Sequence, residues 1–155
     1  MKKGLLIAAA ALLSANVYAA HPLQGYKAAS LCGSNNYQGG NSCLSTNGSS
    51  ILKPQKVVKG KDMAWVFRNV SNQTIRVGSG WSGSGYRGCR AWGAVMSADL
   101  SKKLATAVPE KSFQIPPKAA LVFSEKYFKD PKWGACGPWD MILPTQFGEI
   151  EVENM

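Results

Sequence analysis

From Ile51 onward the sequence is a series of short apolar runs, rich in β-branched and aromatic residues and separated by Gly, Pro and Asn. Runs of this kind indicate β-strands joined by turns. They predict strands at 55–58, 63–69, 74–78, 89–97, 112–115, 121–127, 139–143 and 149–153. Short strands with frequent turns favour an all-β fold, an antiparallel β-sandwich that is immunoglobulin-like or related, with a closed barrel as the alternative.

The apolar pattern also predicts whether an individual strand lies at the centre or at the edge of a sheet. In 63–67 both faces are apolar, so this segment is expected at the centre of a sheet. In the last strand Ile150 and Val152 alternate with acids, so one face is expected to be buried and the other solvated at an exposed edge. The acids are Glu149, Glu151 and Glu153. One short helix is predicted over 98–105, where Leu100 and Leu104 are one turn apart.

The first residues have the features of an export signal. Lys2 and Lys3 precede an apolar run over 4–15, and Val17 and Ala19 then stand at the two selective positions of a signal-peptidase site. We expect cleavage after Ala19, with cleavage after Ala20 as the alternative, and hence a secreted or periplasmic protein. Loss of the two lysines lowers the formal net charge from +9 by two, to +7. No later stretch is apolar for long enough to cross a membrane.

The cysteines of the expected mature part are even in number, which in an exported chain predicts two disulfides. Three pairings are open, and we favour Cys32–Cys43, which closes a local loop, and Cys89–Cys136, which joins distant strands. A zinc site is the weaker alternative because the spacing of the cysteines does not fit a metal knuckle. The predicted organisation is a signal peptide at 1–19, a disulfide-clamped segment rich in Gly, Asn and Ser at 20–50, and a core at 51–155, with 20–155 forming one domain.

The sequence argues against an enzyme. Its single histidine, His21, lies near the expected start of the mature chain, and disulfide-bonded cysteines are unavailable as nucleophiles. No motif for a cofactor is present, so none is expected. If cleavage falls after Ala20, the α-amine and imidazole of His21 form a chelate that suits copper, which makes weak copper binding one hypothesis.

Two loops combine aromatic and basic residues. One, at 78–92, is rich in Gly and Ser, and the other, at 129–139, ends beside Cys136. Aromatic rings beside arginines suit the stacking of sugar rings and the binding of anions. The ligand-binding residues predicted from these loops are Trp81, Tyr86, Arg87, Arg90 and Trp133. By contrast, Trp92 and Trp139 are expected to be buried beside a disulfide.

These features favour a non-enzymatic binding protein that contacts a glycan or an anionic envelope or membrane surface. The alternative is a protein–protein interaction module, such as an inhibitor, a toxin component or an adhesin. Specific nucleic-acid binding is not expected because the lysines are scattered and no recognition motif is present.

Overall fold

The computed structural model describes residues 23–35, 40–85, 91–124, 126–127, 129–130, 134–135 and 138–154. Every element in these ranges is a strand, and the pairings between strands are antiparallel. Two large sheets and a small hairpin are formed. The expected all-β, antiparallel fold is confirmed. The alternative of a closed barrel is wrong, because the two large sheets are separate and each has its own edge strands.

The six-stranded sheet has the order β1-β4-β5-β11-β8-β9. Its strands are β1 (Lys27–Ala29), β4 (Leu52–Lys59), β5 (Asp62–Asn69), β11 (Ala120–Ser124), β8 (Gly93–Met96) and β9 (Lys103–Ala107). β5 lies inside this sheet, between β4 and β11, as its apolar faces predicted.

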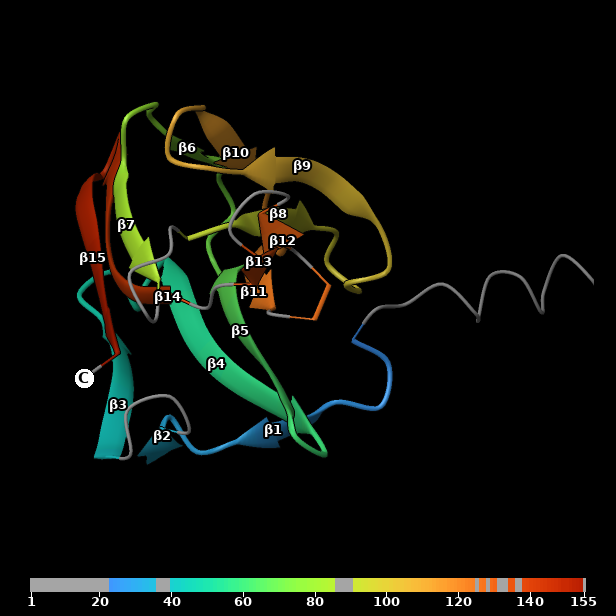
Figure 1. The fold of residues 1–155 in the computed structure, drawn as a ribbon. Helices are drawn as coiled ribbons and strands as arrows, with labels where there is room; N and C mark the ends of the chain where they lie inside the picture. The colour runs from blue at the N-terminus through green and yellow to red at the C-terminus, as the bar shows by residue number, and fades with distance from the viewer. Residues whose placement is uncertain are drawn as a thin grey trace, which may run out of the picture.

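The seven-stranded sheet has the order β10-β6-β14-β15-β3-β2, and β7 also pairs with β14. Its strands are β10 (Phe113–Ile115), β6 (Ile75–Val77), β14 (Pro138–Thr145), β15 (Gly148–Asn154), β3 (Gly40–Thr46), β2 (Cys32–Asn35) and β7 (Ser82–Gly85). The hairpin consists of β12 (Lys129–Asp130) and β13 (Gly134–Ala135). In Figure 1, β15, β14 and β7 stand on one side and β4, β5 and β11 lie beside them.

The main core lies between the two sheets. It joins Trp65 and Phe67 of β5 and Phe123 of β11 to Met141 and Leu143 of β14, all of them buried. Phe67 and Phe123 pack edge to face, with ring centroids 6.1 Å apart. Aromatic side chains therefore fill the space between the layers.

A second apolar cluster covers the opposite, outer face of the six-stranded sheet. In β5, Ala64 and Val66 alternate with the core residues and so point outward, yet both are fully buried. Leu23 belongs to this cluster, and Tyr26 and Leu100 pack against it. The N-terminal segment runs along this side before it enters β1 (Figure 1). The sheet is thus buried on both faces at its centre.

The structure corrects three expectations. Residues 98–105 are not helical, because Ser97 and Ser101 bond to Asp99 in a turn and β9 begins at Lys103. β15 is not an edge strand, because β14 and β3 flank it, although Ile150 and Val152 are buried and Glu149 and Glu151 are exposed as expected.

The third correction concerns the segment before Ile51. It was expected to lie outside the core, but β3 pairs with β15 and β1 pairs with β4, and Leu44 is buried in the main core. The described residues from 27 to 46 therefore contribute strands to both sheets.

Candidate functional site

The structure describes only some of the residues that were predicted to bind a ligand. Tyr86, Arg87, Arg90 and Trp133 lie outside the described residues, as do His21, the signal segment, Cys89 and Cys136. The disulfide between Cys32 and Cys43 is confirmed, and these cysteines face each other across β2 and β3. Trp92, expected to be buried, is half-buried. The hypothesis that Tyr86, Arg87, Arg90 and Trp133 bind a ligand therefore stays a prediction.

Trp81 is in the core and does not present its ring at the surface. It is 2% exposed, its indole Nε1 donates to the carbonyl of Val108 at 3.0 Å, and its ring packs edge-on against Phe113. Gly80 has a φ of 75°, and its amide donates to the carbonyl of Pro109. Gly80 thus lets the chain turn inward, and the burial of Trp81 corrects the expectation that this ring stacks on a ligand.

Strand register instead gathers cations on the outer face of the six-stranded sheet. Lys53 of β4 lies opposite Arg68 of β5, and Arg68 lies opposite Ala120 of β11. Ala120 lies opposite Met96 of β8, which lies opposite Lys103 of β9. These paired residues form one row across the sheet, from β4 to β9. Lys53 and Lys103 lie at the two ends of the row, and Arg68 lies within it.

Two turns at the same end of the sheet add further lysines. We call the whole set the basic row; it consists of Lys53, Arg68, Lys102, Lys103 and Lys118. The lysines of the row are exposed, and Arg68 is half-buried. Leu104, which follows Lys103 directly, is 44% exposed. The row therefore presents several ammonium groups and one apolar side chain to solvent.

Arg68 fixes the geometry of the basic row. Its Nη1 donates to the carbonyl of Ala98 at 2.8 Å and to the carbonyl of Lys118 at 2.6 Å. These two carbonyls belong to different turns, and the guanidinium holds both against the sheet. Asp99 lies in the first turn, where hydrogen bonds from the hydroxyls of Ser101 and Ser97 lower the pKa of its carboxyl to about 2. The turn thus keeps its shape through its own hydrogen bonds.

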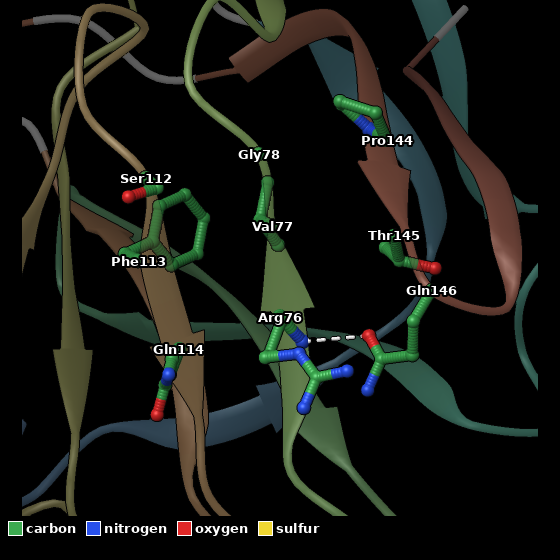
Figure 2. Close-up of a pocket in the computed structure, with 9 residues that line it drawn as sticks. All are labelled: Arg76, Val77, Gly78, Ser112, Phe113, Gln114, Pro144, Thr145 and Gln146. Carbon is green, nitrogen blue, oxygen red and sulfur yellow. Dashed lines mark hydrogen bonds between the residues drawn. The ribbon is translucent and has the colours of Figure 1, made fainter.

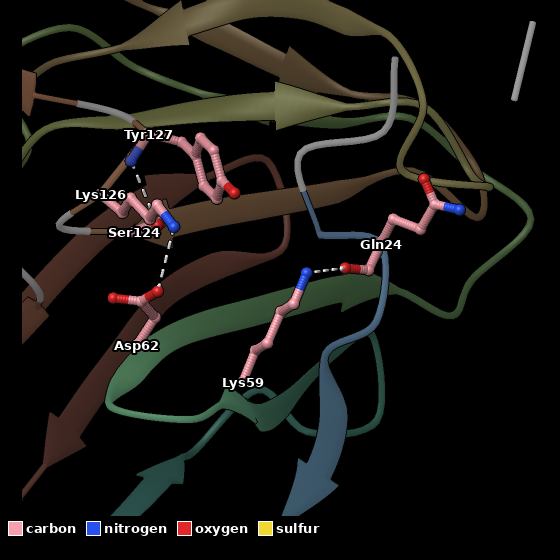
Figure 3. A network of polar contacts seen from close by, with 6 residues as sticks. All are labelled: Gln24, Lys59, Asp62, Ser124, Lys126 and Tyr127. Carbon is pink, nitrogen blue, oxygen red and sulfur yellow. Dashed lines mark hydrogen bonds and ion pairs between the residues drawn. The ribbon is translucent and has the colours of Figure 1, made fainter. Parts of the chain in front are cut away.

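A second cationic group lies at the opposite end of the same sheet, around the β4–β5 hairpin (Figure 3). Lys126 Nζ is 3.2 Å from Asp62 Oδ2 and 5.6 Å from the centre of the Tyr127 ring. Lys59 Nζ donates to the carbonyl of Gln24 at 3.2 Å, which ties the N-terminal segment to the hairpin. Both ends of this outer face therefore carry lysines.

Tyr26 borders this second group and stays protonated. Its ring centroid is 6.4 Å from that of Tyr127. Burial raises the pKa of Tyr26 to about 12, and the charges of Tyr127 and Asp62 act in the same direction. The phenol is therefore neutral at physiological pH and covers the sheet as an uncharged group.

The outer face of the other sheet has the opposite charge. On β15, Glu149 and Glu151 are exposed and Glu153 is half-buried, and Glu153 lies opposite the exposed Asp140 of β14. Among the described residues, cations are therefore concentrated on the six-stranded face, where the acids nearby are Asp62 and Asp99, and four of the eight described acids lie on the seven-stranded face. No group of three or more His, Cys, Asp and Glu side chains in the described ranges is placed to hold a metal ion.

The chain matches no protein-family model, and no curated protein or solved structure is significantly similar to it. Among the described residues, no helix is long and apolar enough to span a membrane.

The sequence pattern did not reveal the basic row, because its members are far apart along the chain. One local signal was present. Gly60 and Lys61 form a two-residue turn between the paired Lys59 and Asp62, and this turn fixes the register that sets Lys53 opposite Arg68.

Proposed function

We propose that this protein is an exported, non-enzymatic binding protein that attaches to an anionic surface of the cell envelope through the outer face of its six-stranded sheet. The observation that carries the proposal is the separation of charge between the two outer faces. A surface with one sign of charge orients the molecule as it approaches an anionic layer and speeds its association.

The acids on the other face do not cancel this attraction. Packed sheets are about 10 Å apart, and their outward side chains lie further apart still. The Debye length at physiological ionic strength is about 8 Å. An anionic layer in contact with the basic row is therefore largely screened from Glu149, Glu151 and Asp140.

An exposed apolar side chain lies beside the basic row. Leu104 is exposed directly beside Lys102 and Lys103. Each Lys or Arg near an anionic lipid surface contributes about 1 kcal/mol, and an inserted apolar side chain adds to this. Anionic lipid headgroups supply the phosphates to which lysines bind, and the acyl layer beneath accepts a leucine.

Export is part of the proposal and is supported by the chemistry of the cysteines. A disulfide such as Cys32–Cys43 persists in an oxidising compartment and is rare in the cytosol. Outside the cytoplasm a bacterial-type chain meets anionic envelope polymers and lipids. The predicted loop residues Tyr86, Arg87, Arg90 and Trp133 would add further contacts to the same kind of surface.

Co-sedimentation with vesicles tests the proposal. The processed protein should bind phosphatidylglycerol vesicles at low salt and should not bind phosphatidylcholine vesicles. The variant Lys53→Gln/Lys102→Gln/Lys103→Gln should bind at least about tenfold more weakly. The control Lys27→Gln/Lys61→Gln/Lys111→Gln loses the same net charge from exposed positions outside the basic row and should bind almost normally. Equal losses in the two variants, or no binding by the wild-type protein, would overturn the proposal.

A further inference from the structure

An open groove of about 580 Å³ lies on the seven-stranded sheet where β6, β10 and β14 meet (Figure 2). It forms because β6 pairs with β14 only between Val77 and Thr145. The chain then leaves the sheet, and β7 resumes the pairing with β14 at Ser82, opposite Ile142. Gly78 lines the groove and has no side chain to fill the space beside Pro144 of β14. The volume of the groove lies in the range of small-ligand sites.

We infer that this groove binds a carboxylate group. Arg76 points outward from β6, because its neighbours Ile75 and Val77 are buried in the core. Its guanidinium makes no hydrogen bond or ion pair with the residues that the structure describes, and Gln114 lies directly opposite on β10. A planar guanidinium with an amide beside it has the donors that hold a carboxylate through two parallel hydrogen bonds.

The wall opposite Gln114 is fixed in position. The Oε1 of Gln146 accepts a hydrogen bond from the backbone amide of Arg76 at 2.8 Å, and its Nε2 donates to the carbonyl of Thr74 at 2.6 Å. The amide of Gly78 donates to the carbonyl of Pro144 at 3.0 Å. Figure 2 shows the side chains of Arg76, Gln114 and Gln146 arranged around the groove. A ligand therefore meets a site whose amide wall is already ordered, which lowers the entropy cost of binding.

The residues that line the groove contain no carboxylate, histidine or cysteine, so its chemistry is that of binding. The acid that strand register brings nearest is Glu149, opposite Pro144 on β15. Its charge repels an anionic ligand, and the Glu149→Gln variant should bind more tightly.

Gly78 offers a substitution that narrows the groove without disturbing the fold. A Cβ at this position would lie 3.6 Å from Cγ of Pro144, which is an ordinary van der Waals contact, and the backbone of Gly78 is not in the left-handed region. The methyl group of Gly78→Ala would therefore occupy space in the groove while the protein folds normally.

Carboxylates that fit such a site come from two sources, an acidic sugar and the C-terminus of a peptide. Both present a carboxylate beside groups that hydrogen-bond with Gln114 and with the hydroxyl of Ser112. Glucuronate and N-acetyl-alanine are small probes for the two sources, and glucose is the uncharged control.

An NMR titration of the processed, 15N-labelled protein tests the inference. Glucuronate or N-acetyl-alanine should shift the amide signals of Arg76, Gly78 and Thr145, and glucose should not. The tighter of the two acids identifies the source of the ligand. Arg76→Gln should weaken binding of that acid at least tenfold and Gly78→Ala severalfold, whereas Lys103→Gln on the other sheet should leave it unchanged. Failure of both acids to shift these signals, an equal response to glucose, or undiminished binding by Arg76→Gln would overturn the inference.

Discussion

Lys53 and Arg68 lie directly opposite each other on β4 and β5, and both side chains point to the outer face of the six-stranded sheet. Like charges in this position destabilise an antiparallel pair, whereas opposite charges stabilise it. The fold tolerates the repulsion in part because two carbonyls accept hydrogen bonds from the Arg68 guanidinium. A destabilising pair of cations is what a surface adapted to anions would carry.

Replacing Lys53 with Glu should therefore stabilise the protein while it weakens binding to anionic vesicles. A Glu–Arg pair in place of the Lys–Arg pair should raise the free energy of unfolding by about 0.2–1 kcal/mol. Urea unfolding measures this, with Lys53→Gln as the intermediate case. A Lys53→Glu protein that is less stable than the wild type would show that the pair is not repulsive.

Trp81 is expected to act through stability. Trp81→Phe keeps an aromatic ring but removes the hydrogen bond to the Val108 carbonyl and leaves a gap, so it should lower the free energy of unfolding by about 2 kcal/mol. Trp81→Ala should cost about 3–5 kcal/mol. Vesicle binding by folded Trp81→Phe should be unchanged. If this variant keeps full stability and loses binding, Trp81 is a surface residue after all.

Asn69 joins the ends of the two sheets and should be among the most sensitive polar residues. Its Nδ2 donates to the carbonyls of Gln73, Ile115 and Pro116, and its Oδ1 accepts from Ser71. The side chain is fully buried, so its loss leaves several groups without partners.

Asn69→Ala should therefore lower the free energy of unfolding by about 3 kcal/mol or more, as measured in urea. Asn72→Ala, at an exposed position in the same turn, is the matched control and should change it by less than about 0.5 kcal/mol. Similar values for the two variants would refute the role given to Asn69.

Because the hydroxyl of Tyr26 is buried, we predict that the protein loses stability at alkaline pH. The pKa of its phenol is raised from the ordinary value of 10.0 to about 12, mainly by burial. Below pH 10 the phenol is protonated in both the folded and the unfolded chain. Between pH 10 and 12 the unfolded chain loses this proton while the folded chain keeps it, so the free energy of unfolding falls as pH rises.

The Tyr26→Phe variant should lose less stability than the wild type over the same pH interval. Ultraviolet titration of tyrosinate in the folded protein should show an ionisation near pH 12 in the wild type that is missing from Tyr26→Phe. Ionisation of Tyr26 near pH 10 would contradict its burial against the outer face of the six-stranded sheet.

The sequence predicted most of the strands after Ile51 because their side chains alternate or are continuously apolar. The strand at 62–69 could be placed inside a sheet from Ala64, Trp65, Val66 and Phe67 alone. β3 was missed because, of its residues 43–46, only Leu44 is a buried apolar side chain, and one such residue gives no period to recognise. The helix at 98–105 was predicted from the spacing of Leu100 and Leu104, but Leu100 has a φ of 61°, which no helix allows.

The candidate site was harder to predict because it depends on long-range register. Lys103 belongs with Lys53 only because β9, β8, β11, β5 and β4 are neighbours in that order. Which strands are neighbours in a sheet depends on the topology of the whole chain, and no local sequence pattern specifies it. For Trp81 the local pattern misled the prediction. Its Gly and Ser neighbours indicated an exposed side chain, but the backbone turn buries the ring.

In the proposed function one face of the protein meets the anionic surface, and paramagnetic broadening in NMR reports that face directly. The labelled protein is bound to phosphatidylglycerol bicelles that contain a small fraction of spin-labelled lipid. We predict that the amide signals of Lys53, Lys102 and Lys103 broaden strongly and that those of Glu149 and Glu151, on the opposite sheet, stay sharp. Equal broadening on both faces, or stronger broadening at the glutamates, would contradict the proposal.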